Sequence, residues 1–379
     1  MGYVEAIKTA ILIFPLIAFL FTLPFILHQY HKYGAIHKFR TLIIYSFILY
    51  MITIYFLVIL PLPSISDVTK PDKIMNLIPF SFVDDFINKS SFIINDPNTY
   101  LQALTSSSFY VAAFNILMTI PFGMYLRYYF KFSFKKVFFF SFCLSLFFEL
   151  TQLSGLYFIY PYPYRLFDVD DLILNTLGGV LGYFIMGLVD NFLPTRDEID
   201  KQAKELGKTV SGLRRITLFF LDMFIFIIFT IFISIFTKKA IYISFIIYYI
   251  LLPYFKNNQT LGGKFLNVKL DFPNKKLIRL TLRIIFIYAY YFILVYFLGI
   301  GSIVTISYLN LNTFISFILY VLVLLGIFTF YLTNIILILK DKTIFYDKLF
   351  KVTYESTILI EEEIHDESEG DENEKRESV

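Results

Sequence analysis

Acidic and amide side chains gather where one apolar segment, 136–155, gives way to the next, 168–189. The polar residues at this junction are Glu149, Gln152, Arg165, Asp168, Asp170, Asp171 and Asn175. Residues three or four apart share one face of a helix, which places Glu149 with Gln152 and Asp171 with Asn175. Carboxylates arranged in this way bind Mg²⁺ or Ca²⁺ through oxygen ligands, or divide their pKa values for acid–base chemistry.

Three interpretations of this junction stay open. The first is helix capping and packing, because aspartates favour a helix N-terminus and Arg165 has neighbouring aspartates to pair with. The second is a site for a polar lipid headgroup or an envelope precursor, and the third is a catalytic or metal site. Asn115, inside the apolar segment 108–128, is a further candidate for this pocket or for a hydrogen bond between helices. The residues indicate no particular metal or cofactor.

A second group of polar residues lies later in the chain. Asp222 stands inside an apolar segment, where an acidic residue needs a partner. Arg215, seven residues earlier and on roughly the same face, is the expected partner, and ion or proton movement is the alternative. A glycine-containing turn and a late aspartate complete the group, which consists of Arg215, Asp222, Gln259, Thr260, Gly262, Lys264 and Asp347.

The elements that position these residues are apolar helices. The 379-residue chain is 57% hydrophobic and only 17% charged, with a mean hydropathy of +0.68. This balance excludes a soluble globular domain, a disordered chain and a disulfide-rich secreted module. Backbone in lipid forms helices or closed barrels, and segments of about 20 residues fit helices. We therefore expect an all-α, polytopic integral membrane protein with about nine transmembrane helices in two bundles. The expected spans are 9–27, 41–60, 108–128, 136–155, 168–189, 215–236, 240–255, 281–303 and 312–339.

The distribution of basic residues predicts the orientation. The connections on one side of these spans contain twenty Lys and Arg residues, against seven on the other. Because cytoplasmic connections carry the excess of positive charge, the N-terminus is expected outside and the C-terminus in the cytoplasm of the cell membrane. The junction of the fourth and fifth spans then faces outward.

Composition also divides the chain into parts. Residues 1–195 form a first membrane module of five helices with a polar outer loop, 61–107. Residues 196–212 form a charged cytoplasmic linker, and 213–356 form a second module of four helices. The acidic tail, 357–379, is too polar to build a core and is expected to be disordered.

The first module resembles the VanZ-like family over about residues 41–189. The matching residues are Asn76-x-x-Pro79-Phe80, Asn115, Pro121-x-Gly123, Glu149-x-x-Gln152, Arg165-x-x-Asp168-x-Asp170-Asp171-x-x-x-Asn175 and Gly178-Gly179-x-x-Gly182. The resemblance implies a small helical membrane domain linked to resistance to teicoplanin-type glycopeptide and lipoglycopeptide antibiotics in Gram-positive bacteria.

The second module resembles the RDD family over about residues 209–356. Arg215, Asp222 and Asp347 occupy the family's charged positions. Its turn is matched by Gln259, Thr260, Gly262 and Lys264, although Asn258 replaces a glycine and Gly263 is additional. Some members of that family are proposed to be ion/proton antiporters.

We therefore expect a cell-envelope protein that lowers sensitivity to teicoplanin-type antibiotics through an outward polar pocket. The expected partners are membrane lipids, a lipoglycopeptide antibiotic or a lipid-linked cell-wall precursor, with no nucleic acid. One alternative is a membrane enzyme whose outer carboxylates act on a lipid-linked headgroup. The other is an ion- or proton-coupled transporter that uses the second module.

Overall fold

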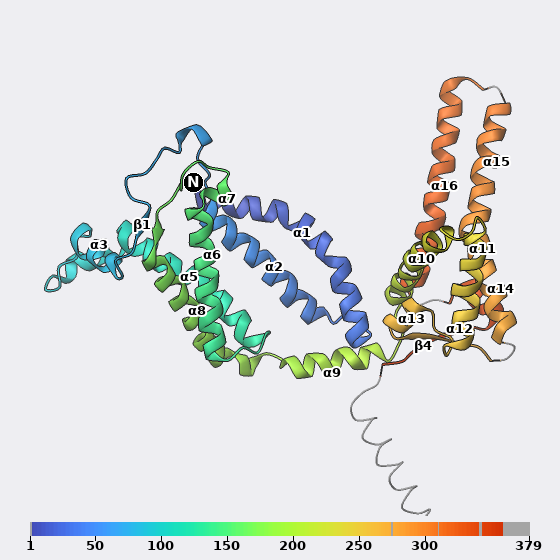
Figure 1. Cartoon of the computed structure of the whole chain (residues 1–379), viewed down its shortest axis with the longest axis horizontal. Helices are drawn as coiled ribbons and strands as arrows, with labels where there is room; N and C mark the ends of the chain where they lie inside the picture. The colour runs from blue at the N-terminus through green and yellow to red at the C-terminus, as the bar shows by residue number, and fades with distance from the viewer. Residues whose placement is uncertain (1, 274–275, 310, 341–342, 359–379) are drawn as a thin grey trace, which may run out of the picture. The chain divides into compact units, whose positions relative to one another are not determined.

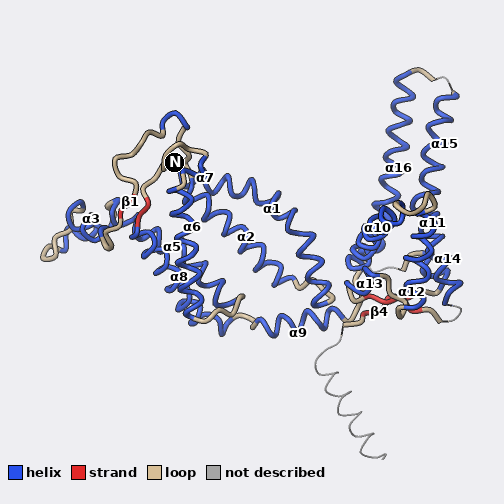
Figure 2. Tube along the Cα trace, viewed as in Figure 1, coloured by secondary structure: helices blue, strands red, loops and turns tan. Residues whose placement is uncertain are grey.

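The structure is a computed structural model that describes residues 2–273, 276–309, 311–340 and 343–358. Over these ranges the chain is mostly helical, with a few very short strands (Figure 1, Figure 2). The predicted tail falls almost wholly outside the described residues. The chain forms two compact units. The first comprises Met1–Thr22 and Lys38–Ile199, and the second comprises Leu23–His37 and Asp200–Val379.

Eight helices in the described ranges are long and apolar enough to cross a membrane. They are Val4–Tyr33, Lys38–Ile59, Ser107–Tyr128, Phe134–Leu153, Val169–Phe192, Gly212–Ser234, Lys276–Tyr308 and Thr313–Leu339. The remaining predicted span, Ala240–Phe255, is a shorter apolar helix. Large apolar side chains on these helices are exposed, such as Leu12 at 80% and Phe314 at 72%. Lipid rather than water suits such a surface, and the predicted helical, multi-pass membrane fold is confirmed.

The long helices of the first unit are the N-terminal part of α1 (Gly2–Tyr33), α2 (Lys38–Ile59), α5 (Ser107–Tyr128), α6 (Phe134–Leu153) and α8 (Val169–Val189). Helix α8 packs on both α5 and α6. Small residues allow this approach: a Cβ added to Gly182 would lie 2.0 Å from the Ile120 oxygen, and one added to Gly178 would lie 2.1 Å from Thr119 Oγ1. Gly178 and Gly182 therefore allow α8 to pack closely against the neighbouring helix.

Short elements connect these helices. The loop before α5 contains η1 (Ile65–Asp67), β1 (Met75–Asn76), α3 (Ser81–Lys89), η2 (Pro97–Thr99) and α4 (Tyr100–Leu104). The turn α7 (Gly155–Phe158) and the strand β2 (Phe167–Asp168) join α6 to α8, and η3 (Asp190–Phe192) follows. Strands β1 and β2 pair in parallel, with Asn76 opposite Asp168. This pairing fixes the long loop at the start of α8.

The second unit begins with the C-terminal part of α1. The expected linker contains a helix, α9 (Arg196–Gly207). The elements that follow are α10 (Gly212–Ser234), α11 (Ala240–Phe245), η4 (Ile246–Leu251), α12 (Leu252–Phe255), α13 (Leu261–Phe265), β3 (Val268–Asp271), α14 (Lys276–Tyr288), η5 (Ala289–Ile293), α15 (Leu294–Tyr308), α16 (Thr313–Leu339), α17 (Phe345–Phe350) and β4 (Thr353–Ser356). Strands β3 and β4 are antiparallel. A buried cluster of Tyr30, Leu218, Leu266 and Val268 joins α1, α10 and the β3 segment.

Candidate functional site

Asp168 and Asp170 organise the N-terminal end of α8. Asp168 caps the helix, since its Oδ1 accepts a hydrogen bond from the Asp170 amide at 2.9 Å. The Asp170 carboxylate is 3% exposed and accepts hydrogen bonds from the Phe80 amide at 2.6 Å, the Ser81 hydroxyl at 2.7 Å and the Phe82 amide at 2.9 Å. All three donors precede or begin α3, so Asp170 holds the long loop against α8.

Asn76 completes this attachment. Its Nδ2 donates to the Asp168 carboxylate at 3.2 and 3.3 Å and to Ser81 Oγ at 2.9 Å. Its Oδ1 accepts a hydrogen bond from Lys73 Nζ at 3.1 Å. Sequence reasoning placed Asn76 in a family motif but not in the polar pocket. Its position opposite Asp168 in the strand pair accounts for the contact.

Three helices contribute polar groups behind this attachment. Glu149 of α6 is 2% exposed, and its Oε2 accepts a hydrogen bond from the Asp168 amide at 2.9 Å. Asp171 of α8 accepts a hydrogen bond from Asn115 of α5 at 2.5 Å. The Glu149 carboxyl lies within electrostatic reach of Asp168, Asp171 and Arg165. The structure therefore brings Asn115, Glu149, Asp168 and Asp171 together.

Asn175 extends the group one turn further along α8. Its Nδ2 donates to Ser145 Oγ at 3.0 Å, and Ser145 donates to the Asp171 carbonyl at 3.0 Å. Asn175 is 4% exposed and Ser145 is completely buried. Among the described residues, neither Asn175 Oδ1 nor Ser141 Oγ has a hydrogen-bonding partner. Buried acceptors are rarely left unpaired, so each of these atoms could accept a hydrogen bond from a donor.

Gln152 and Arg165 bond to the end of α2 instead of to the carboxylates. Gln152 Nε2 donates to the Val58 carbonyl at 3.1 Å, and Arg165 donates to Val58 at 2.9 Å and to Leu60 at 3.2 Å. The last carbonyls of a helix lack partners within it, and a guanidinium satisfies them well. The Arg165–aspartate ion pair considered under helix capping is not formed within the part of the chain that the structure describes.

Over the described ranges, no group of three or more His, Cys, Asp or Glu side chains is placed to hold a metal ion. The carboxylate oxygens of Asp168, Asp170 and Asp171 already accept hydrogen bonds, from Asn76, the Phe80 amide and Asn115 respectively.

Asp222 of the second unit is bonded entirely by neutral donors. Its carboxylate is 7% exposed and accepts from the Tyr248 hydroxyl at 2.7 Å, the Thr260 hydroxyl at 2.8 Å and the Gly262 amide at 3.1 Å. A Cβ on Gly262 would lie 2.4 Å from Asp222 Oδ1, so this turn requires glycine. Gln259 Nε2 donates a hydrogen bond to the Val268 carbonyl at 3.2 Å, which stabilises the same turn. Lys264 is exposed.

The predicted Arg215–Asp222 pair is wrong. Arg215 Nη2 donates to Asp347 Oδ2 at 3.2 Å, and Arg283 Nε donates to Asp347 Oδ1 at 2.8 Å. Seven residues along a helix span about 10 Å. At that separation Arg215 and Asp222 each bond to a closer partner instead. Sequence reasoning missed Arg283, which it counted as a flanking charge, although a basic residue within an apolar helix was a usable signal.

Tyr354 of β4 lies against both guanidinium groups. Its hydroxyl accepts a hydrogen bond from Arg283 Nη2 at 2.5 Å, and its ring centroid lies 4.5 Å from the Arg215 guanidinium carbon. Burial raises the pKa of Tyr354 above its ordinary value, so the phenol stays neutral at neutral pH. The sequence offered no signal for this tyrosine among the 29 of the chain.

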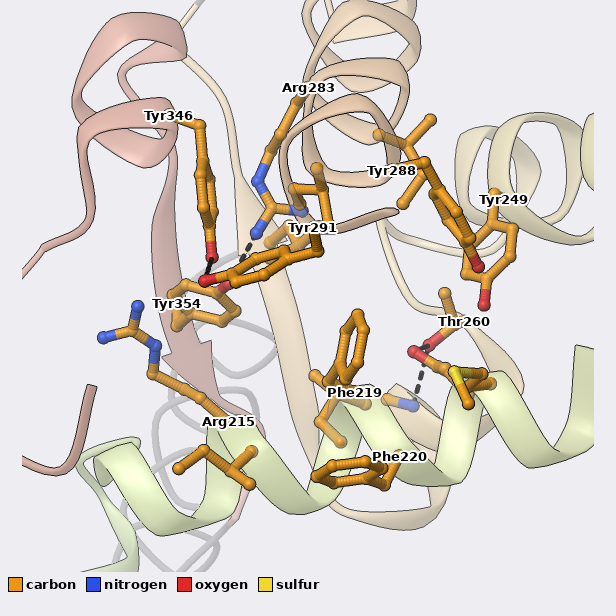
Figure 3. A pocket seen from close by; sticks show the side chains of 18 of the residues that line it. Arg215, Phe219, Phe220, Tyr249, Thr260, Arg283, Tyr288, Tyr291, Tyr346 and Tyr354 are labelled. Carbon is orange, nitrogen blue, oxygen red and sulfur yellow. Dashed lines mark hydrogen bonds between the residues drawn. The ribbon is translucent and has the colours of Figure 1, made fainter. Parts of the chain in front are cut away.

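These residues surround a cavity of about 330 Å³. Its lining includes Arg215, Asp222, Asn258, Thr260, Arg283 and Tyr354, with aromatic and aliphatic side chains between them. Figure 3 shows Arg283, Tyr346 and Tyr354 gathered on one side and Tyr249, Tyr288 and Thr260 on the other. The second unit thus encloses a mainly apolar space with polar groups at two ends.

The first unit contains a segment that matches a known protein family. A model of the VanZ/LLP1 family matches residues 47–190. Those residues are a VanZ/LLP1 family domain. The match contains the polar cluster, which we define as Asn115, Ser145, Glu149, Asp168, Asp171 and Asn175, together with the Asp170-bound loop. The protein is therefore a multi-pass membrane protein with a VanZ-family domain.

The remaining comparisons add no relatives. No family match supports the RDD-like resemblance of the second module. No curated protein and no solved structure matches the chain.

Proposed function

We propose that this protein is a cell-envelope protein that lowers sensitivity to teicoplanin-type glycopeptide and lipoglycopeptide antibiotics. The VanZ-family domain over residues 47–190 supports this direction. The observation that carries the proposal is the polar cluster, where three helices bring acidic and amide groups together, Glu149 and Asn175 are buried, and Asn175 Oδ1 has no partner among the described residues.

The chemistry of the cluster favours a ligand rich in hydrogen-bond donors. Glu149 and Asp171 supply carboxylate oxygens, and Asn175 supplies a buried amide oxygen. Buried acceptors are costly when unpaired, so a hydroxyl or amine donor would bind there favourably. We propose a membrane lipid, a lipid-linked cell-wall precursor or the antibiotic itself as the partner. The excess of basic residues on the opposite connections supports an outward-facing cluster, with the N-terminus outside and the C-terminus in the cytoplasm.

Susceptibility measurements test this proposal. A Gram-positive host would express wild type, Glu149→Gln or Asp171→Asn, and the amount of protein in the membrane would be matched by immunoblot. Wild type should raise the inhibitory concentration of teicoplanin, and both substitutions should reduce that protection. Asp85→Asn, in an exposed ion pair with Lys89, is the control and should protect like wild type. Lack of protection by a correctly inserted wild-type protein would refute the proposal.

Asp222 favours a second candidate function for the second module. We propose that this module is RDD-like and couples to ions or protons. A buried carboxylate that contacts only neutral donors favours binding of a proton or a cation. Flux driven by a pH or sodium gradient in vesicles should be lost in Asp222→Asn, and absence of flux in wild type would exclude this candidate.

A further inference from the structure

The cavity of the second unit is large enough for a small molecule. Its volume of about 330 Å³ lies at the lower end of the range for ligand sites. Apolar and aromatic side chains, including Phe219, Ile284 and Tyr291, also line it. The chemical identity of a fitting ligand follows from the polar groups at its two ends.

Arg283 supplies unused hydrogen-bond donors at one end. The guanidinium group has five N–H donors. Its Nε donates to Asp347 and its Nη2 donates to the Tyr354 hydroxyl. Of the residues that the structure describes, no other accepts a hydrogen bond from Arg283, although this side chain is only 6% exposed. This end therefore suits a carboxylate or a phosphate, which accepts several hydrogen bonds from one guanidinium.

Asp222 and Asn258 supply acceptors at the other end. Asp222 is 7% exposed and bonds to Thr260, Tyr248 and Gly262, none of which is cationic. Asn258 Oδ1 is buried and has no hydrogen-bond partner among the described residues. Both residues line the cavity. A carboxylate and an unpaired amide oxygen that line the same cavity suit an ammonium group, which carries three donors and a positive charge.

We propose that this cavity binds a small zwitterion, with a carboxylate or phosphate toward Arg283 and an ammonium toward Asp222 and Asn258. The opposed ends fix the direction of the ligand, and the aromatic middle accommodates an apolar body. Free amino acids and the ethanolamine phosphate headgroup of a lipid share this chemistry. The inference concerns the second unit and does not depend on the function proposed for the VanZ-family domain.

Calorimetric titration of the full chain in phosphatidylglycerol nanodiscs tests the inference. The probes are L-phenylalanine, L-leucine, phosphoethanolamine and a short-chain phosphatidylethanolamine. Phenethylamine and 3-phenylpropanoate are matched probes that carry one charge each. The best zwitterion should bind about tenfold more tightly than either single-charge probe. Preference for the lipid identifies a headgroup as the source, and preference for the other zwitterions identifies a free solute. Absence of zwitterion binding, or equal binding of a single-charge probe, would overturn the inference.

Two substitutions separate ligand recognition from structural support. Asp222→Asn should weaken phenylalanine binding and leave 3-phenylpropanoate unchanged, because only the former carries an ammonium. Arg283→Lys keeps the charge beside Asp347 but has fewer donors, so it should weaken phenylalanine and 3-phenylpropanoate while phenethylamine is unchanged. Lys269→Gln removes an ion pair with Glu355 outside the cavity lining and should change none of them. Equal weakening of all probes by Asp222→Asn and Arg283→Lys in folded protein would contradict the proposed direction.

Discussion

Asp170 in the first unit and Asp222 in the second are both buried carboxylates that accept three hydrogen bonds. The donors to Asp170 are consecutive residues at the start of α3, Phe80, Ser81 and Phe82. Those to Asp222 come from two parts of the chain, Tyr248 and the turn that contains Thr260 and Gly262, and Asp222 also lines a cavity. The same number of hydrogen bonds therefore accompanies two different structural roles. Asp170 fixes the path of the chain, whereas Asp222 remains beside space that a ligand can occupy.

The largest effect on stability is expected at Asp347. Asp347→Ala removes the carboxylate that Arg215 and Arg283 share and leaves their guanidinium groups buried without it. Breaking a buried ion pair in this way costs about 3–5 kcal/mol. Thermal unfolding of the purified protein should show a large loss of stability. Lys269→Ala, which breaks an exposed ion pair with Glu355, should cost at most about 1 kcal/mol. Similar losses in both variants would contradict the ion-pair account.

A smaller effect is expected at Asp170. Asp170→Ala removes the acceptor for two amides and one hydroxyl. Hydrogen bonds to charged groups contribute about 1.5–3 kcal/mol each, and losses within one network are not additive. The loop 73–82 should become sensitive to limited proteolysis. If the loop is cleaved no faster than in wild type, Asp170 does not hold it, and the contrast with Asp222 fails.

The smallest effect is expected at Asp197, on the surface of the first unit. A hydrogen bond from Lys131 lowers the pKa of Asp197 below its ordinary value of 3.8. A carboxylate with a lowered pKa in the folded state stabilises the fold above its unfolded pKa and loses that contribution as the pH falls through its folded pKa. The small difference in melting temperature between wild type and Asp197→Asn should therefore be present at neutral pH, decrease below pH 3.8 and vanish below the lowered pKa of the folded state. A difference that persists there would point to another cause.

Local spacing predicted much of the helical framework and part of the polar cluster. Glu149, Asp168 and Asp171 lie near the facing ends of two helices that follow each other in the chain, and consecutive elements usually lie side by side. The seventh predicted span, 240–255, is shorter than a membrane-spanning helix, because apolar content alone does not determine how far a helix extends.

Contacts between distant residues were beyond sequence reasoning. Asp170 lies 90 residues from Phe80, and Arg215 lies 132 residues from Asp347. Helix periodicity does not predict where the irregular loop before α3 lies. It also does not predict that α17 packs near Arg215. The incorrect pairing of Arg215 with Asp222 arose because only local partners could be assessed from the sequence.

The most direct test of the account compares Asp171→Asn with Asp222→Asn in the teicoplanin susceptibility assay at matched membrane levels. Each substitution replaces one carboxyl by an uncharged amide with little change in shape, the first in the VanZ-family domain and the second in the other unit. The account predicts that Asp171→Asn loses protection and Asp222→Asn retains it. Full protection by Asp171→Asn, with loss in Asp222→Asn, would contradict the assignment of function to the polar cluster of the first unit.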